Sequence, residues 1–228
     1  MMKTNLLLML ALASASALFA ADPSPKDAIT AAAKKLADTP SYSWKTTTVV
    51  AEGARFKPGP IEGKTETDGF TYVTLSFGDS LSEIALKGEK AVVTNEEGNW
   101  QLASELENGE GRSRFIGRMA RNFSKPAAQA ANLLPAVKEL SKDGDVYSGD
   151  LTEEGAKKQF RFGDPKNPKG SVKFWVKDGV LAKFVTKVEA KVEVNGEEID
   201  ASRTTTTEIK DIGTTKVNVP SEAKKKLS

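Results

Sequence analysis

The chain of 228 residues contains no cysteine and no histidine. These two absences exclude a thiolate nucleophile, an imidazole base and a disulfide, and they remove the usual ligands of zinc, copper and haem. We therefore expect no metal and no cofactor. Charges nearly cancel, with 33 Lys plus Arg against 31 Asp plus Glu. Nucleic acid is not an expected partner, because its binding usually needs a strongly basic surface.

Long apolar runs are also missing, apart from one at the N-terminus. After the positive charge of Lys3, residues 6–19 are all apolar or small. Such a run is typical of a secretory signal peptide, and it is shorter than the roughly 20 residues that span a membrane. We predict a signal peptide over residues 1–20, cleaved to leave a single domain over 21–228. Because no cysteine is available for a lipid anchor, we expect the mature chain to be free in a periplasm.

The rest of the sequence switches between strand-like and helix-like patterns. Apolar spacing predicts an N-terminal helix capped by Ser24. Alternating β-branched and aromatic residues predict five or six antiparallel strands over 41–101, and strands return over 146–219. Between these regions, helical spacing covers 108–142 and is interrupted by Pro135. The sequence therefore predicts an α+β fold.

The clearest local pattern is a β-hairpin centred on Asn195-Gly196. These two residues favour a tight type I′ turn, and the residues before them alternate between apolar and charged. With that turn, Lys183 faces Glu208 on the wet side and Val188 faces Arg203 on the apolar side. Each arm has about 12 to 14 residues, or roughly 40 Å, which exceeds an ordinary strand. Arms of this length belong to a large curved sheet or barrel.

The helical region carries two stripes. The basic stripe, Arg114, Arg118 and Arg121, could contact anionic lipid or an acidic partner, or could simply keep the outer side of a helix in water. The apolar stripe could contact a ligand or fill the core. Arg203 could reach water at the rim of the sheet, or it could form a polar latch or touch a ligand inside the apolar concavity. The candidate ligand-contacting residues are Phe115, Ile116, Met119, Phe123, Leu133, Leu134, Val137, Phe184, Val188, Val192 and Arg203.

The aromatic residues of the predicted strands could line a cleft for a lipid or glycan, or they could fill the core. They are Tyr42, Trp44, Phe70, Tyr72, Trp100 and Trp175.

The order of these segments resembles the periplasmic lipoprotein-carrier superfamily, which includes LolA-like and LolB-like carriers and LppX-like lipid carriers. The resemblance rests on a signal peptide, a helix, strands containing Gly98-Asn99-Trp100, an Ala- and Leu-rich helical insert, and strands containing Phe174-Trp175-Val176-Lys177-Asp178-Gly179-Val180-Leu181. It implies an unclosed antiparallel β-barrel of about eleven strands. It also implies that helices at about 111–142 form a lid over the concave face, with acyl chains bound beneath.

The leading hypothesis is a soluble, non-enzymatic periplasmic carrier or chaperone for the acyl chains of a lipid or lipoprotein, with transient membrane contact. The first alternative is an envelope structural or stress-sensing module that binds a protein through the same fold. The second is a glycan hydrolase that works with paired carboxylates. A Ser-x-x-Lys pattern begins at Ser221, but that serine is better explained as the cap of a short helix after Pro220. We therefore predict no catalytic residues.

Overall fold

The computed structural model describes residues 23–228 apart from 55–56, 68, 78–79, 161–162 and 195. The predicted signal peptide lies outside the described residues. The helical elements are α1 (Pro25–Ala37), α2 (Ala103–Glu107), α3 (Gly111–Arg121), α4 (Pro126–Leu133), the 3-10 turn η1 (Leu134–Ala136), α5 (Glu153–Lys157) and α6 (Ser221–Leu227). Among the described residues, no helix is long and apolar enough to cross a membrane.

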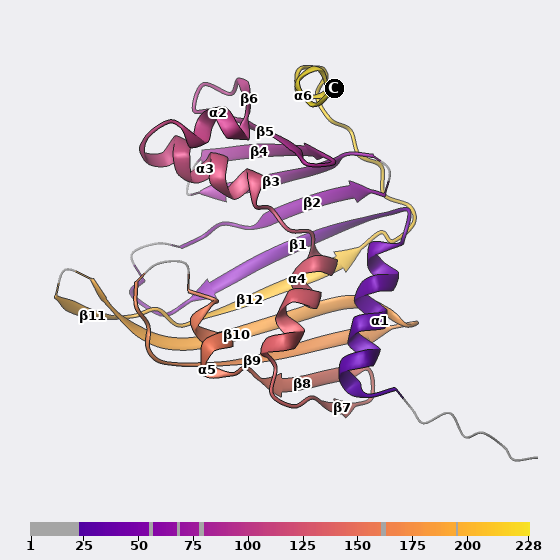
Figure 1. The fold of residues 1–228 in the computed structure, drawn as a ribbon, viewed down its shortest axis with the longest axis vertical. Coiled ribbons are helices and arrows are strands. Elements are labelled where there is room, and N and C mark those ends of the chain that lie inside the picture. The colour runs from indigo at the N-terminus through magenta and orange to yellow at the C-terminus, as the bar shows by residue number, and fades with distance from the viewer. Residues whose placement is uncertain (1–22, 55–56, 68, 78–79, 161–162, 195) are drawn as a thin grey trace, which may run out of the picture.

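The strands form one antiparallel sheet that is not closed (Figure 1). They are β1 (Ser41–Val50), β2 (Ile61–Glu66), β3 (Thr71–Phe77), β4 (Ser80–Lys87), β5 (Lys90–Thr94), β6 (Trp100–Leu102), β7 (Ser141–Asp143), β8 (Val146–Asp150), β9 (Lys166–Lys177), β10 (Val180–Val194), β11 (Glu197–Asp200) and β12 (Arg203–Lys210). Their order is β6-β5-β4-β3-β2-β1-β12-β10-β9-β8-β7, and β11 pairs with β10. The predicted α+β half-barrel of about eleven strands is therefore confirmed.

The predicted hairpin has the predicted register. Lys183 faces Glu208 and Val188 faces Arg203 in the β10–β12 ladder. Side chains alternate between buried and exposed along β10, as the sequence pattern requires. The second arm is divided into β11 and β12 at residues 201–202, where the Asp200 carboxylate accepts a hydrogen bond from the Ser202 amide at 2.8 Å. The register is the same on both sides of this interruption, and the Ala201 amide still donates a hydrogen bond to the Ala190 carbonyl at 3.0 Å. Asn195 of the turn lies outside the described residues.

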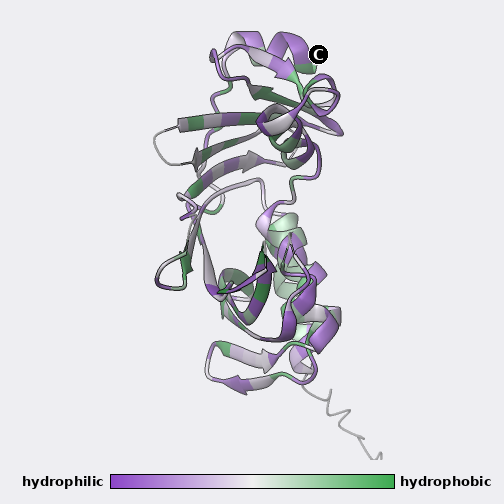
Figure 2. Cartoon of the chain, turned by 90° about the vertical axis from the view of Figure 1, so that its left-hand side faces the viewer, coloured by the Kyte–Doolittle hydropathy of each residue, from purple (hydrophilic) through white to green (hydrophobic). Residues whose placement is uncertain are grey.

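One face of the sheet, here called the inner face, lies under the helices (Figure 2). Helix α1 begins at its predicted cap, where Ser24 Oγ accepts a hydrogen bond from the Asp27 amide at 3.2 Å. Its buried side, including Ile29 and Leu36, packs on β10 and on α4. Helix α3 instead packs on α2 and β5. The helices thus form two covers, the α1–α4 cover and the α2–α3 cover, over different strands.

The helical region ends earlier than predicted. Instead of continuing to residue 142, it stops at η1, and the chain becomes extended at Val137, which pairs with Leu151. The Lys138 amide then donates a hydrogen bond to the Asp150 carbonyl at 2.9 Å. The physical reason is that Pro135 has no N–H to donate and its ring crowds the carbonyl of the preceding turn, which disfavours a continuous helix. Pairing with β8 then satisfies the backbone groups of the residues that follow. The lid predicted at 111–142 is therefore helical only to residue 136.

The opposite, outer face is covered at one end by α6. Ala223 and Leu227 are buried there against Trp100, Val92 and Ala85 of β4–β6. Helix α6 begins at Ser221 with Pro220 as its N-cap, so the predicted role of Ser221 as the cap is wrong. The serine is the first helical residue and not the residue before it.

Candidate functional site

The centre of the inner face is an aromatic cluster on β1, which has five strands on each side of it. The Trp44 ring lies directly over Gly63 of β2, so close that a Cβ at Gly63 would sit 2.0 Å from a ring carbon. Tyr42 lies beside Trp44 with ring centroids 5.7 Å apart, and Phe123 stacks on Trp44 at 6.2 Å. Phe123 belongs to the link between α3 and α4. The aromatic cluster therefore lies where the two covers meet.

The other aromatic residues that could have lined a cleft are not part of this cluster. Trp100 and Tyr72 pack with the group around α6 on the outer face, where their rings lie 6.4 Å apart. Trp175 neighbours the Lys183 ammonium, which lies 5.2 Å from its ring centre. In both strand groups, the alternation of side chains turns these residues away from the two covers. Only Tyr42 and Trp44 of the six named strand aromatics face the covers.

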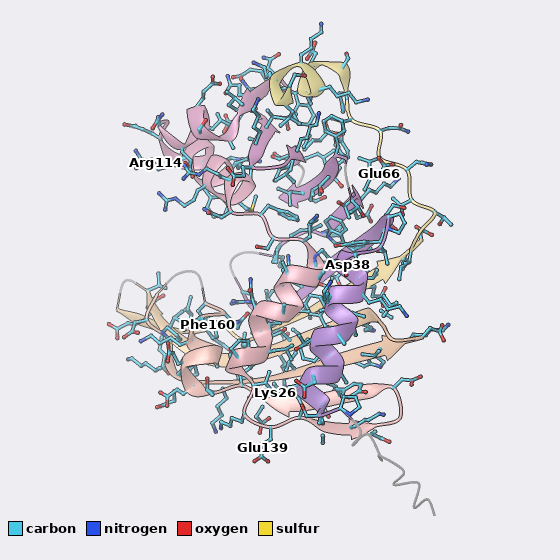
Figure 3. The ribbon with its side chains drawn as sticks, turned by 45° about the vertical axis from the view of Figure 1, so that its right-hand side comes forward. Lys26, Asp38, Glu66, Arg114, Glu139 and Phe160 are labelled. Carbon is cyan, nitrogen blue, oxygen red and sulfur yellow. The ribbon has the colours of Figure 1, made fainter. Side chains whose placement is uncertain are left out.

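The α1–α4 cover combines larger apolar side chains, among them Ile29 and Leu36 of α1, with several alanines. Its buried residues include Ala32 and Ala33 on α1 and Ala127 and Ala130 on α4. Beyond the C-terminal end of α4, the Lys26 ammonium of α1 donates a hydrogen bond to the Val137 carbonyl at 2.6 Å. Lys26 is labelled in Figure 3. The cover is thus tied down at one end and meets the aromatic cluster at the other. Little apolar area holds the middle of α4 in place.

Tyr42 is a polar group inside this apolar contact. Its hydroxyl is buried and has no hydrogen-bond partner of suitable geometry among the described residues. Burial raises the pKa of Tyr42 to about 12, and the backbone amide of Ala127 acts in the opposite direction. The hydroxyl therefore lies near the first turn of α4, where helix amides have no intrahelical partner.

Most of the predicted ligand-contacting residues come together on the inner face. Eight of them belong to or pack against one apolar core under the covers: Ile116, Met119, Phe123, Leu133, Leu134, Val137, Phe184 and Val188. Val192 is buried separately, against Gly163. Phe115 differs, because it is 37% exposed and lies on the outer side of α3. The inner side of α3 is formed by Ile116, Gly117 and Ala120.

Arg203 acts as a latch between the sheet and the segment after α5. Its guanidinium donates a hydrogen bond to the Gln159 carbonyl and lies 4.8 Å from the centre of the Phe160 ring. Among the predicted alternatives this arrangement corresponds to the polar latch, since Arg203 holds residues 159–160 against β12. Phe160 in turn packs on the apolar core.

Threonines form a polar band on the inner face beyond Trp44. The hydroxyls of Thr46 and Thr207 are 2.9 Å apart, and those of Thr48 and Thr205 are 3.2 Å apart. Thr46, Thr48 and Thr205 are half-buried, so this end of the inner face is less covered than the part around Trp44. The band could contact the polar end of a ligand whose apolar part lay beneath the covers.

The predicted cavity is closed in this structure. Side chains at the centre of the inner face, such as Trp44, Phe174 and Phe184, are buried by their neighbours. A hollow of about 840 Å³ lies elsewhere, lined mainly by charged residues whose positions in the ladders face outward, including Lys187, Glu189 and Lys191. Its lysines are largely engaged, as in the 2.7 Å ion pair between Lys191 and Glu198. An acyl chain would thus need movement of a cover.

The basic residues of α3 are not equivalent. Arg121 forms an ion pair with Glu107 of α2 at 2.6 Å, and Arg114 Nε donates to the Gly109 carbonyl at 2.9 Å. Arg118 is exposed.

Within the described ranges, no group of three or more carboxylates could hold a metal ion.

No protein-family model and no curated protein matches the sequence. Among solved structures, the chain is similar to the lipoprotein LppX of Mycobacterium tuberculosis, with 13% identity and a TM-score of 0.49 over 87% of this chain and 100% of that one. It is also similar to LprF of Mycobacterium bovis, with 10% identity and a TM-score of 0.47 over 87% and 97% of the two chains. A putative outer membrane lipoprotein-sorting protein domain from Vibrio parahaemolyticus has 9% identity and a TM-score of 0.28, over 80% and 89%. Similarity of this size concerns the arrangement of the elements alone.

Proposed function

We propose that the chain is a non-enzymatic carrier that binds the acyl chains of a lipid or lipoprotein between the inner face of its half-barrel and the helical covers. The observation that carries this proposal is the apolar inner face, which lies beneath a cover whose helix α4 buries mainly small side chains. This cover meets a second cover at Phe123. A cover of this kind separates from the sheet with little loss of packing. A ligand with an apolar chain would then take its place.

The energies favour such an exchange. Exposing the inward alanines of α4, Ala127 and Ala130, together with Leu133, costs about 4 kcal/mol at about 0.8 kcal/mol per methyl and about 2 kcal/mol for a leucine. An acyl chain that buries a dozen methylenes gains about 10 kcal/mol on the same scale. The difference of about 6 kcal/mol is available to offset the freedom that the ligand loses on binding. Burial of the chain therefore supplies a driving force for loading.

The proposed place of action is outside the cytoplasm. It rests on the predicted signal peptide over residues 1–20, which lies outside the described residues. The absence of cysteine from the sequence leaves no residue for a thioether-linked lipid anchor. We accordingly propose a carrier that is free in the periplasm. Release of the cargo would need a membrane or partner that offers a similar apolar environment.

Two consecutive threonines on β1 give a direct test. Thr46 faces the inner side and Thr47 is exposed on the other side of the same strand. We expect Thr46→Trp to fill the space beside Trp44 and to weaken the binding of a fluorescent fatty acid at least tenfold. Thr47→Trp, the matched control, should leave binding unchanged. Circular dichroism and thermal unfolding would establish that both variants are folded.

Native mass spectrometry provides the complementary measurement. Protein purified from a cell-envelope fraction should carry a lipid adduct, and the adduct should be lost in Thr46→Trp. An adduct-free protein that also fails to take up fluorescent fatty acid would refute the carrier proposal.

The closed inner face favours one alternative, a module that binds an envelope protein without lipid. Trp44 and Phe184 are only 3% and 4% exposed, so this face offers no preformed space for a chain. On this alternative, affinity purification would return one protein partner, and neither threonine variant would change a lipid signal. The two hypotheses thus give opposite results in the same purification.

A further inference from the structure

The outer side of α3 combines an exposed aromatic ring with arginines. Phe115 is 37% exposed, although its neighbour Ile116 is buried. Arg112 and Arg118 lie three residues before and after Phe115, and both are exposed. Residues three apart lie on the same side of a helix. The ring is therefore flanked by two guanidinium groups on the surface that α3 turns away from the sheet.

The charge on this surface is not balanced within the helix. Helix α3 contains four arginines and no acidic residue. Glu107 neutralises Arg121, whereas no carboxylate of the described residues lies within ion-pair distance of Arg112 or Arg118. Figure 3 shows Arg114, on the same helix, projecting from the edge of the molecule. We call Arg112, Phe115 and Arg118 the α3 surface.

We propose that the α3 surface docks on an anionic lipid bilayer. A helix that lies on a protein surface with basic side chains around an aromatic ring has the composition of an interfacial membrane binder. Guanidinium groups pair well with lipid phosphates, and the ring can enter the region between headgroups and acyl chains. Charge complementarity thus selects a bilayer rich in anionic headgroups over a zwitterionic one.

The helix is suited to docking without unfolding. Its inner side packs so closely on α2 that a Cβ at Gly117 would lie 2.7 Å from the Ala103 carbonyl oxygen. The α3 surface is therefore held by a rigid two-helix unit. Membrane docking concerns the outer side of the α2–α3 cover, whereas acyl chains are proposed to bind on the inner face of the sheet. Either proposal can therefore be refuted without affecting the other.

The experiment uses the mature chain and vesicles of phosphatidylcholine with or without about 30% phosphatidylglycerol. Because the protein has no cysteine, Phe115→Cys gives a unique site for an environment-sensitive dye. We expect a blue shift and stronger emission with anionic vesicles, a smaller effect with zwitterionic vesicles, and weakening as salt is raised. The same dye at Lys177→Cys on β9, an exposed position, should show no shift.

Charge reversal tests the arginines without the dye. The double variant R112E/R118E should bind anionic vesicles at least tenfold more weakly in a flotation assay. The charge-matched control K173E/K177E changes two exposed lysines on β9 and should bind within twofold of the wild type. Thermal unfolding would show that both variants are folded.

Three results would overturn the proposal: equal binding to both kinds of vesicle, equal loss in the two double variants, or binding to polyglutamate but not to vesicles. The last result would identify an acidic protein as the partner. Uptake of fluorescent fatty acid from solution should be unchanged in R112E/R118E. A variant that still loads but does not dock would confirm that the two properties are separate.

Discussion

The contact between Gly63 and Trp44 allows a quantitative prediction about the centre of the inner face. Gly63→Ala would place a methyl group 2.0 Å from a Trp44 ring carbon, whereas carbon atoms at contact are about 3.5 to 4.0 Å apart. The ring would have to move by about 1.5 Å, and Tyr42 and Phe123 pack against it. Overpacking of this kind costs about 1–3 kcal/mol. Because Gly63 does not have a positive φ, alanine adds no backbone strain that would obscure the clash.

We therefore expect Gly63→Ala to lower the free energy of unfolding by about 2 kcal/mol. In a Trp44→Phe background the smaller ring leaves room for the methyl group, and the same substitution should be neutral or stabilising by up to about 1 kcal/mol, since alanine restricts the unfolded chain. Urea denaturation followed by far-ultraviolet circular dichroism measures both differences. Lys64→Ala, at the exposed neighbouring position, is the control and should change stability by less than about 0.5 kcal/mol. Equal effects of Gly63→Ala in the two backgrounds would refute the packing argument.

Two further predictions concern groups that the covers bury. Because burial raises the pKa of Tyr42 to about 12, its contribution to stability is complete below the unfolded-state pKa of about 10 and is lost as pH rises from about 10 to 12. Tyr42→Phe should reduce the fall of the unfolding free energy with pH, as measured by urea unfolding. Part of the fall should remain, because burial also raises the pKa of Tyr72. An unchanged dependence of the unfolding free energy on pH would contradict the assignment to Tyr42. Arg203→Ala should speed hydrogen exchange in residues 153–160 about tenfold, since the hydrogen bond to the Gln159 carbonyl and the cation–π contact with Phe160 are removed. Thr204→Ala on the same strand should not change this exchange. Unchanged exchange would show that Arg203 does not hold this segment.

The sheet was predictable from sequence because strand pairing follows a period of two. From Phe184 to Glu193 in β10 this period places a buried side chain at every second position, and a slip of one residue would reverse the two faces. The Asn195-Gly196 turn and the pair Lys183 and Glu208 then select one register. The interruption between β11 and β12 was not predictable in the same way, because it is local and leaves the register unchanged. It coincides with a hydrogen bond from the Ser202 amide to the Asp200 side chain.

The orientation of α3 could not be read from its apolar residues alone. Phe115 and Ile116 are adjacent, so they point about 100° apart on a helix and cannot both face the centre of a narrow contact. The close packing of Gly117 on α2 decides between them and turns Ile116 inward. Glycine at 117 was the available signal, because a helix lacking a side chain at one position can approach its neighbour closely there. The sequence prediction used the larger residues and therefore grouped Phe115 with Ile116, whereas the structure buries Ile116 and leaves Phe115 37% exposed.

The division of the helices into two covers changes how opening would occur in a carrier. A single lid over the whole inner face would expose all of its apolar contacts at once, whereas the α1–α4 cover and the α2–α3 cover contact different strands and meet at Phe123. We expect the seam at Phe123 to open first, because α4 contributes mainly alanines and its far end is fixed by Lys26. The α2–α3 cover would stay in place, held by the close packing of Gly117. On this view, ligand would enter over Trp44, with its polar end near the threonine band.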